Sequence, residues 1–213
     1  MVRGKFITLE GGEGAGKSTQ QRRLAGWLRD SGLEVVETRE PGGSPGAEDI
    51  RRLLVTGTAG RWDPMTELLL IFAARRDHVV RTIEPALARG AWVVCDRFVD
   101  STMAYQGYAQ GLGREAVETL QSLVTGGLQP DLTLILDLPV KQGLARAKSR
   151  AGSEDRYEKM DPDFHARLYD AFHDIAEREP QRCLLIDAAG DEDKVSARLQ
   201  AAVSERLGVA AAG

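Results

Sequence analysis

The sequence predicts an α/β fold: a doubly wound, five-stranded parallel sheet with helices on both faces. Short and mostly apolar runs, typical of strands that are buried on both faces, alternate with longer helical patterns. Polar motifs follow several of these runs, and the carboxyl ends of parallel strands form the ligand-binding edge of such a sheet. The expected strands are Phe6–Leu9, Leu33–Thr38, Ala91–Cys95, Leu132–Asp137 and Cys183–Asp187.

Helical patterns fill the segments between the expected strands. Ser18–Asp30 carries apolar residues at helical spacing, and Ser31-Gly32 ends the pattern. Asp63-Pro64 has the form of an N-cap followed by proline at the first helical position, which predicts a long helix toward Ala88. Further helices are expected over Arg114–Val124, Val140–Ser149, Asp163–Glu177 and Asp191–Leu207.

Length and composition predict a single domain over residues 1–213. The chain is 42% hydrophobic and 28% charged, and its length suffices for a substantial core without disulfides or metals. A net charge of −4 disfavours a nucleic-acid polymer as partner, so a small anion would have to meet a local basic cluster. Two cysteines without ligand spacing predict reduced thiols. Neither a signal peptide nor a membrane-length apolar run is visible, so we expect a cytoplasmic protein without a membrane partner.

A glycine-rich loop follows the first expected strand and precedes a helix. It matches G-x-x-x-x-G-K-[ST], in which glycines let backbone N–H groups approach phosphate and the helix N-terminus stabilises the anion. Lys17 supplies positive charge for the β and γ phosphates, and the Ser18 hydroxyl is suited to hold Mg²⁺. A chance match is disfavoured because strand, loop and helix all stand where the motif requires them. The expected nucleotide-binding residues are Gly11, Gly12, Glu13, Gly14, Ala15, Gly16, Lys17, Ser18 and Thr19.

Polar motifs also follow the second and third expected strands. The first, TREPGG at residues 38–43, predicts a tight turn whose charges could reach a ligand, although alone it fits an ordinary strand-ending turn. In the second, Asp96 could organise Mg²⁺ through water, and Arg97 offers a planar fork that matches phosphate. The alternative for this pair is a turn cap with an ion pair at the surface.

Two basic segments lie outside the strand ends. Arg75-Arg76 falls within the long helix, where arginine pairs usually face solvent. A second segment, from Arg146 to Arg156, leads out of a helix into glycine and serine residues. Because phosphoryl transfer needs water exclusion and cationic support, we expect a short mobile lid at about residues 146–160. A solvated surface loop is the alternative.

Taken together, these segments resemble the thymidylate kinase family of bacteria, from Phe6 to about Asp187. The most specific stretches are LEGGEGAGKST, TREPGG, DRFVDSTMAYQGYAQG and PDLTLILDL, which occur in this order. The resemblance implies a P-loop kinase fold and Mg²⁺-assisted transfer of the γ-phosphoryl group of ATP to dTMP, giving dTDP for dTTP synthesis. It also implies a homodimer that packs through helices beside the acceptor site.

The resemblance also assigns roles to individual residues. Lys17 and Arg97 would act on the phosphates, with Ser18 and Asp96 near the metal. Arg75 would face the thymine O4, and a fixed donor there rejects cytosine because two donors would meet. Tyr105 would crowd the 2′ position of the sugar. The remaining substrate-binding residues would be Glu40, Pro41, Arg51, Ile71, Phe72, Ser101, Thr102 and Gln106.

The chain departs from the family pattern at two points. Ile71 stands where the family has an aromatic ring that stacks on thymine, so either Phe72 rotates in or aliphatic contact replaces stacking. The phosphate loop contains no arginine, so the lid must supply the catalytic arginine: Arg150 is the first candidate and Arg156 the second.

Two other functions remain open from the sequence. A kinase for another nucleoside monophosphate, or for a deoxynucleoside with Glu40 or Asp96 as base, would carry the same loop. A nucleotide-binding regulatory ATPase would carry it too, although the N-K-x-D motif of GTPases is absent from the sequence.

Overall fold

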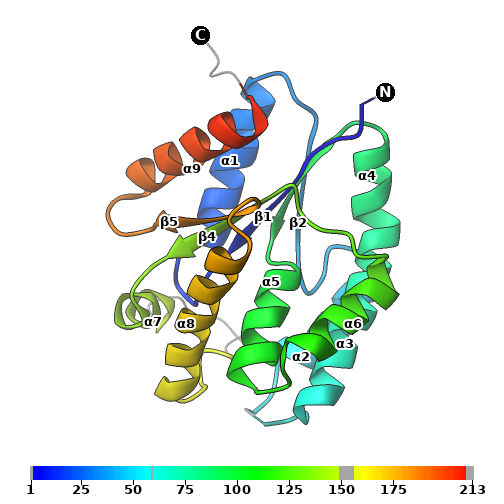
Figure 1. Ribbon diagram of the computed structural model, residues 1–213, viewed down its shortest axis with the longest axis vertical. Helices are drawn as coiled ribbons and strands as arrows, with labels where there is room; N and C mark the ends of the chain where they lie inside the picture. Colours follow the sequence, from blue (N-terminus) through cyan, green and yellow to red (C-terminus); the bar gives the residue numbers. More distant parts are fainter. Residues whose placement is uncertain (1, 59, 149–155, 210–213) are drawn as a thin grey trace.

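The computed structural model describes residues 2–58, 60–148 and 156–209. The described residues contain a five-stranded parallel sheet with strand order β2-β3-β1-β4-β5 (Figure 1). The central strand β1 pairs with β3 on one side and β4 on the other, so the loops after β1 and β3 open beside each other. The predicted fold class is confirmed. The strands are β1 (Phe6–Glu10), β2 (Val35–Arg39), β3 (Trp92–Asp96), β4 (Leu132–Asp137) and β5 (Cys183–Asp187).

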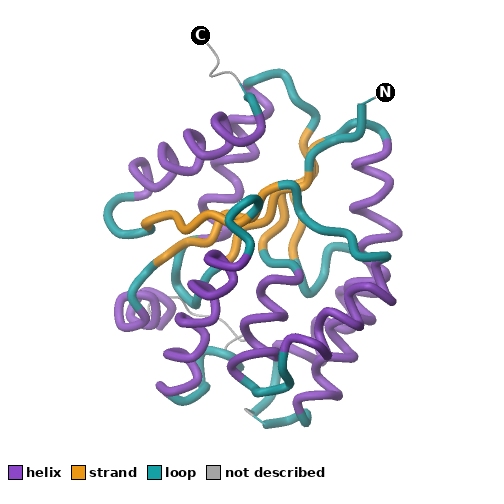
Figure 2. Tube along the Cα trace, in the orientation of Figure 1, coloured by secondary structure: helices purple, strands orange, loops and turns teal. Residues whose placement is uncertain are grey.

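Helices cover both faces of the sheet, and each face has its own apolar core (Figures 1 and 2). On one face, α1 (Lys17–Asp30) and α9 (Glu192–Leu207) pack against Ile7 and Leu9. On the other face, Phe6 belongs to a second core that includes residues of α8 (Pro162–Arg178). Successive residues of a strand point to opposite faces, so a strand covered on both sides is apolar throughout.

A π-helical turn interrupts the long helix that the sequence predicts after Asp63. Asp63 accepts hydrogen bonds from two backbone N–H groups of the first turn, which confirms the N-cap. The helix α3 (Pro64–His78) then widens into η1 (Val79–Ile83) before α4 (Glu84–Ala88). Pro85 gives the physical reason, because it lacks an N–H donor and its ring would clash with the carbonyl four residues earlier.

Three helical segments were not expected from the sequence: α2 (Pro45–Val55), α5 (Val99–Thr102) and η2 (Met103–Ala109). Nearly all residues of α5 and η2 are buried, so they lack the alternation of apolar and polar faces that marks a surface helix. At the start of α2, proline and glycine obscure the helical pattern. The remaining described helices lie where they were expected: α6 (Arg114–Thr125) and α7 (Val140–Lys148).

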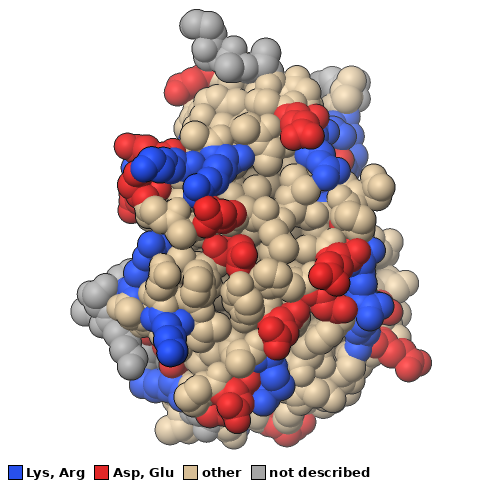
Figure 3. Space-filling view, turned by 60° about the vertical axis from the view of Figure 1, so that its left-hand side comes forward, with Lys and Arg blue, Asp and Glu red and all other residues tan. Residues whose placement is uncertain are grey.

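Charges of both signs are mixed over the face shown in Figure 3. Neither sign covers that face as a continuous patch, whereas proteins that bind nucleic-acid polymers present a basic stripe. In the described part of the chain, no helix combines the length and apolar character needed to cross a membrane.

Candidate active site

The carboxyl ends of β1, β2 and β3 border a cleft of about 360 Å³, which α3 and α5 also line. Parallel strands bring these ends together although they are far apart in the sequence. The cleft contains most of the residues that the sequence analysis assigned to phosphates, metal and acceptor: Glu13, Gly14, Gly16, Lys17, Ser18, Glu40, Pro41, Arg51, Ile71, Arg75, Asp96, Arg97, Ser101, Thr102, Tyr105 and Gln106.

The phosphate loop wraps around the N-terminus of α1. Gly16 caps this helix with φ at 96°, a left-handed conformation that favours glycine. Lys17 Nζ donates to the carbonyl oxygens of Gly11 at 3.1 Å and Gly12 at 2.8 Å. Burial, with the nearby Arg97 cation, lowers the pKa of Lys17 to about 8. A bound phosphate would favour the charged ammonium, so Lys17 is suited to bind an anion here.

A hydroxyl and a carboxylate meet at the first turn of α1. Ser18 Oγ donates to Asp96 Oδ2 at 2.7 Å, which brings together two hard oxygen donors of the kind that Mg²⁺ prefers. The described residues contain no group of three or more acidic, histidine or cysteine side chains that could hold a metal alone. Mg²⁺ typically takes one or two protein ligands and completes its shell with phosphates and water, so Ser18 and Asp96 would suffice as its protein ligands.

Arg97 lies at the centre of the cleft, between the phosphate loop and α5. Its guanidinium donates to Glu13 Oε1, the Gly11 carbonyl and Ser101 Oγ, each at 3.0 Å. It also lies 5.0 Å from the centroid of the Tyr105 ring, whose hydroxyl donates to the same Glu13 oxygen. Burial alone would raise the pKa of Glu13, but the cations of Arg97 and Lys17 outweigh it and lower this pKa to about 2. Glu13 is therefore an anion that holds Arg97 in place.

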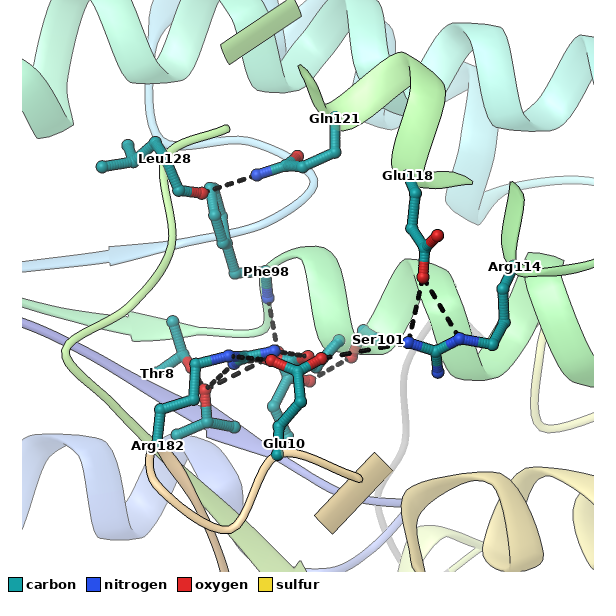
Figure 4. Close-up of polar contacts among 12 residues, drawn as sticks. Thr8, Glu10, Phe98, Ser101, Arg114, Glu118, Gln121, Leu128 and Arg182 are labelled. Atoms are coloured by element: carbon teal, nitrogen blue, oxygen red, sulfur yellow. Dashed lines mark hydrogen bonds and ion pairs between the residues drawn. The ribbon is translucent and has the colours of Figure 1, made fainter. Parts of the chain in front are cut away.

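The backbone of Arg97 is itself held in an unusual conformation. Its φ is 70°, in the left-handed region that costs a non-glycine residue roughly 1–2 kcal/mol. Two residues of β1 hold the backbone N–H groups of Arg97 and of the next residue. Arg97 N–H donates to the Leu9 carbonyl at 3.0 Å, and Phe98 N–H donates to Glu10 Oε1 at 2.8 Å. The Ser101 hydroxyl donates to the other Glu10 oxygen (Figure 4). Glu10 thus sets the direction of the chain as it leaves Arg97.

A buried ion pair supports α5 from the opposite side. Asp100 receives two hydrogen bonds of 2.7 Å from Arg182 and one of 3.0 Å from Thr133. Bidentate pairing of this kind restricts both position and orientation. Burial, reinforced by the negative charge of Asp100, raises the pKa of Glu10 to about 8.

Arg75 is almost completely buried at the side of the cleft away from the phosphate loop. Its guanidinium lies between the rings of Phe72 and Phe98, at 4.8 and 4.9 Å from their centroids. Nε donates to Glu40 and NH2 to Thr102, each at 2.8 Å. The remaining nitrogen, NH1, is buried and has no hydrogen-bond partner in the described protein. An unpaired buried donor is costly, so this nitrogen is suited to an acceptor on a ligand.

Ile71 and Phe72 differ in their positions relative to the cleft. Ile71 lines the cleft, whereas Phe72 is 1% exposed and packs in the core beneath the Arg75 guanidinium. This position does not favour the predicted contact between Phe72 and the substrate, because the ring would have to leave the core and its contact with Arg75 to turn into the cleft. Ile71, with Val55 and Phe98 also lining the cleft, provides the apolar surface instead.

Of the two candidate lid arginines, Arg150 lies outside the described residues and Arg156 lies within them. Arg156 is 2% exposed, and its three guanidinium nitrogens donate to the Thr58 carbonyl, the Leu54 carbonyl and Glu67. A catalytic role for Arg156 would require all of these contacts to break.

Four predicted loop residues lie outside the main cleft. Gly11 and Gly12 contact a small cavity beside β4, while Ala15 and Thr19 line a second cavity of about 460 Å³ together with Arg146 and the segment 188–192. Sequence reasoning missed this second cavity, because nothing in residues 188–192 marks them as a partner of the phosphate loop. Five further residues line the main cleft but were not among the predicted site residues: Arg39, Val55, Phe98, Tyr157 and Glu158.

A phosphate loop that borders two cavities, with an arginine-rich cleft on one side, defines a P-loop phosphotransferase acting on a small phosphorylated acceptor. Residues 9–199 match the family model for thymidylate kinase, and the chain belongs to the thymidylate kinase family. It is 56% identical to a thymidylate kinase of Rhizorhabdus wittichii, covering 96% of this chain and 99% of that one. A thymidylate kinase of Caulobacter vibrioides is 55% identical, covering 98% and 100%. The crystal structure of a thymidylate kinase from Ehrlichia chaffeensis superimposes with a TM-score of 0.76 at 36% identity, covering 94% and 99%.

Proposed function

We propose that this enzyme phosphorylates dTMP to dTDP, with the acceptor in the main cleft and ATP on the other side of the phosphate loop. One observation carries the proposal: Gly14 and Gly16 line both cavities, so the same loop can meet two substrates. The second cavity, lined by Thr19, Arg146 and residues 188–192, is where the rest of ATP would lie.

The unpaired NH1 group of Arg75 supports thymine as the base. Thymine presents the O4 acceptor at the position where cytosine presents an amino donor, so the same nitrogen would pair with one base and oppose the other. Glu40 supports this role because its carboxylate, bonded to both Arg75 Nε and His78 Nδ1, holds the guanidinium still. Apolar contact from Ile71 would replace the aromatic stacking of other family members.

Arg97 and Glu13 are proposed to bind the sugar-phosphate part of dTMP. The Glu13 carboxylate accepts a hydrogen bond from the Arg97 guanidinium and keeps it oriented. The planar guanidinium can donate two parallel hydrogen bonds to phosphate oxygens. Tyr105, whose hydroxyl bonds Glu13, borders the same part of the cleft and would crowd a 2′-hydroxyl.

The geometry of the phosphate loop favours Arg150 as the catalytic arginine. Gly14 has φ at 70°, and a Cβ there would collide with the backbone carbonyl of Gly143 in α7. An arginine at this loop position would therefore force α7 to move. The positive charge of a catalytic arginine must therefore come from another segment. Arg150 is a candidate because it lies shortly after the end of α7 in the sequence.

Chemistry in this site would rest on positioning and charge. The bond between the γ phosphorus and the ADP oxygen breaks as a dTMP phosphate oxygen forms a new bond to that phosphorus. No general base is required, because the acceptor phosphate, with a second pKa of about 6, is already ionised near neutral pH. Lys17, Arg97 and Arg150 would neutralise charge on the moving group, while Ser18 and Asp96 would hold Mg²⁺, which offsets phosphate charge when bound.

A homodimer through α3 and α6 is also proposed. A shallow apolar depression between these helices is lined by Leu69, Ala73 and Leu123, and the leucines are 51% and 79% exposed. Apolar side chains grouped on a surface favour burial against a second copy. Light scattering should give twice the monomer mass for the native chain and the monomer mass for Leu123→Asp; a native monomer would contradict this arrangement.

The assay for the proposed reaction couples ADP formation to NADH oxidation against a panel of nucleoside monophosphates. We expect turnover with dTMP and little with dCMP or AMP. ADP formation that does not depend on any monophosphate would support a regulatory ATPase instead. Preferential phosphorylation of dCMP or AMP would contradict the assignment of Arg75 to thymine.

A further inference from the structure

We infer that Glu67 is a specificity-positioning residue, which orients the Gln106 amide so that its oxygen accepts the N3–H group of the pyrimidine. The inference rests on the proposed binding of dTMP in the main cleft and adds a residue that does not itself line that cleft.

Glu67 is completely buried on α3 and accepts hydrogen bonds from three side chains of two other segments. Its Oε1 receives Gln106 Nε2 at 2.8 Å and Gln110 Nε2 at 2.6 Å, and its Oε2 receives Arg156. The ion pair with Arg156 provides the counter-charge that a buried carboxylate needs. All three donors therefore converge on one carboxylate.

The chemistry of a carboxylate decides how the Gln106 amide is turned. An ionised carboxylate only accepts hydrogen bonds, so Gln106 must present its NH₂ group to Glu67. The amide is planar and Gln106 lines the cleft, so its oxygen is the atom left to meet a ligand. The opposite orientation would place oxygen against oxygen inside the protein.

An acceptor at this position distinguishes the two pyrimidines. Thymine carries a hydrogen on N3, whereas cytosine has a lone pair there. Arg75 and Gln106 would therefore present a donor and an acceptor, each fixed from behind by a buried glutamate: Glu40 for Arg75 and Glu67 for Gln106. Cytosine would be opposed at both positions.

Glutamine at position 67 removes this constraint while keeping the size of the side chain. Its amide offers both a donor and an acceptor, so either orientation of Gln106 is satisfied. An amide free to turn can donate to N3 of cytosine, which removes one of the two mismatches. A base-edge contact is worth roughly 1–3 kcal/mol, which corresponds to about 5- to 150-fold at 1.36 kcal/mol per tenfold change.

The test compares kcat/KM for dTMP with that for 5-methyl-dCMP, which keeps the methyl group. In Glu67→Gln we expect this ratio to fall about 10-fold or more, with a raised KM for dTMP and an unchanged KM for ATP. Gln110→Met, which removes another donor to Glu67 without touching Gln106, should leave the ratio as in the native enzyme. The ratio compares two substrates on one folded enzyme, so a loss of stability does not change it.

An exchange variant keeps the test decisive if Glu67→Gln folds poorly. In Glu67→Gln combined with Gln106→Glu, the amide at 67 can donate to the carboxylate at 106, which again offers an acceptor to N3–H. This variant should recover the preference for dTMP. An unchanged ratio in Glu67→Gln, an equal fall in Gln110→Met, or no recovery in the exchange variant would overturn the inference. Absence of dTMP turnover in the native enzyme would instead refute the proposed function.

Discussion

Replacing Glu10 with glutamine should change the pH dependence of stability by an amount that follows from its burial. Burial and the neighbouring Asp100 raise the pKa of Glu10 from 4.5 to about 8. The folded protein then holds a proton that the unfolded chain releases at pH 4.5, so the stability contributed by this proton is complete below pH 4.5 and is lost as the pH rises toward 8. At 1.36 kcal/mol per pKa unit, the loss between pH 6 and pH 8.5 is about 2.5 kcal/mol.

The assay is urea unfolding of the native chain and Glu10→Gln at pH 6 and pH 8.5. Glutamine does not titrate and resembles the protonated acid. Its oxygen can accept from Phe98 N–H, and its NH₂ group can donate to the Ser101 oxygen once the serine hydroxyl, which donates to the ionised Glu10, turns away. The native chain should lose about 2 to 3 kcal/mol more than Glu10→Gln over this range. Glu118→Gln, on the exposed surface of α6, controls for removal of one negative charge. Parallel pH dependences for the native chain and Glu10→Gln would show that Glu10 is already ionised at pH 6 and refute the reasoning.

Three further predictions concern arginines. Arg150→Ala should lower kcat about 10³-fold in the coupled assay, by analogy with arginine fingers; near-normal turnover would shift the catalytic role to Arg156. Arg156→Ala should lower the free energy of unfolding in urea by roughly 3–5 kcal/mol, because Glu67 would be left as an unpaired buried charge; a change under 1 kcal/mol would contradict this. Arg75→Lys, which keeps the charge but loses the planar fork, should raise KM for dTMP about 10-fold while KM for ATP stays constant; equal changes in both would argue against base recognition.

Much of the fold could be predicted from the sequence because its signals are local. Apolar strands, the Asp63 cap and the phosphate loop each lie within a few consecutive residues, so their patterns can be read without knowing the packing. The same holds for the polar residues that follow β1, β2 and β3, since a parallel sheet places those ends at one edge. The segments α5 and η2 were missed because they are buried almost throughout and carry no amphipathic pattern.

Roles that depend on contacts between distant segments could not be predicted. Ile71 and Phe72 are adjacent in α3, and adjacent side chains of a helix point in different directions. Ile71 therefore lines the cleft, whereas Phe72 contacts the Arg75 guanidinium. Arg156 looked like a lid cation, and only the packing revealed its partner Glu67, 89 residues earlier.

The sequence by itself determined the class of protein: a parallel α/β sheet that carries a phosphate loop, with the motifs of a thymidylate kinase. The tertiary structure decided which charges are buried and what they touch. Glu10, Glu40 and Glu67 are ordinary acidic residues in the sequence, yet each is almost fully buried beside the cleft and orients another group. Burial and hydrogen-bond direction arise from segments that meet only when the chain is folded, so no local pattern records them.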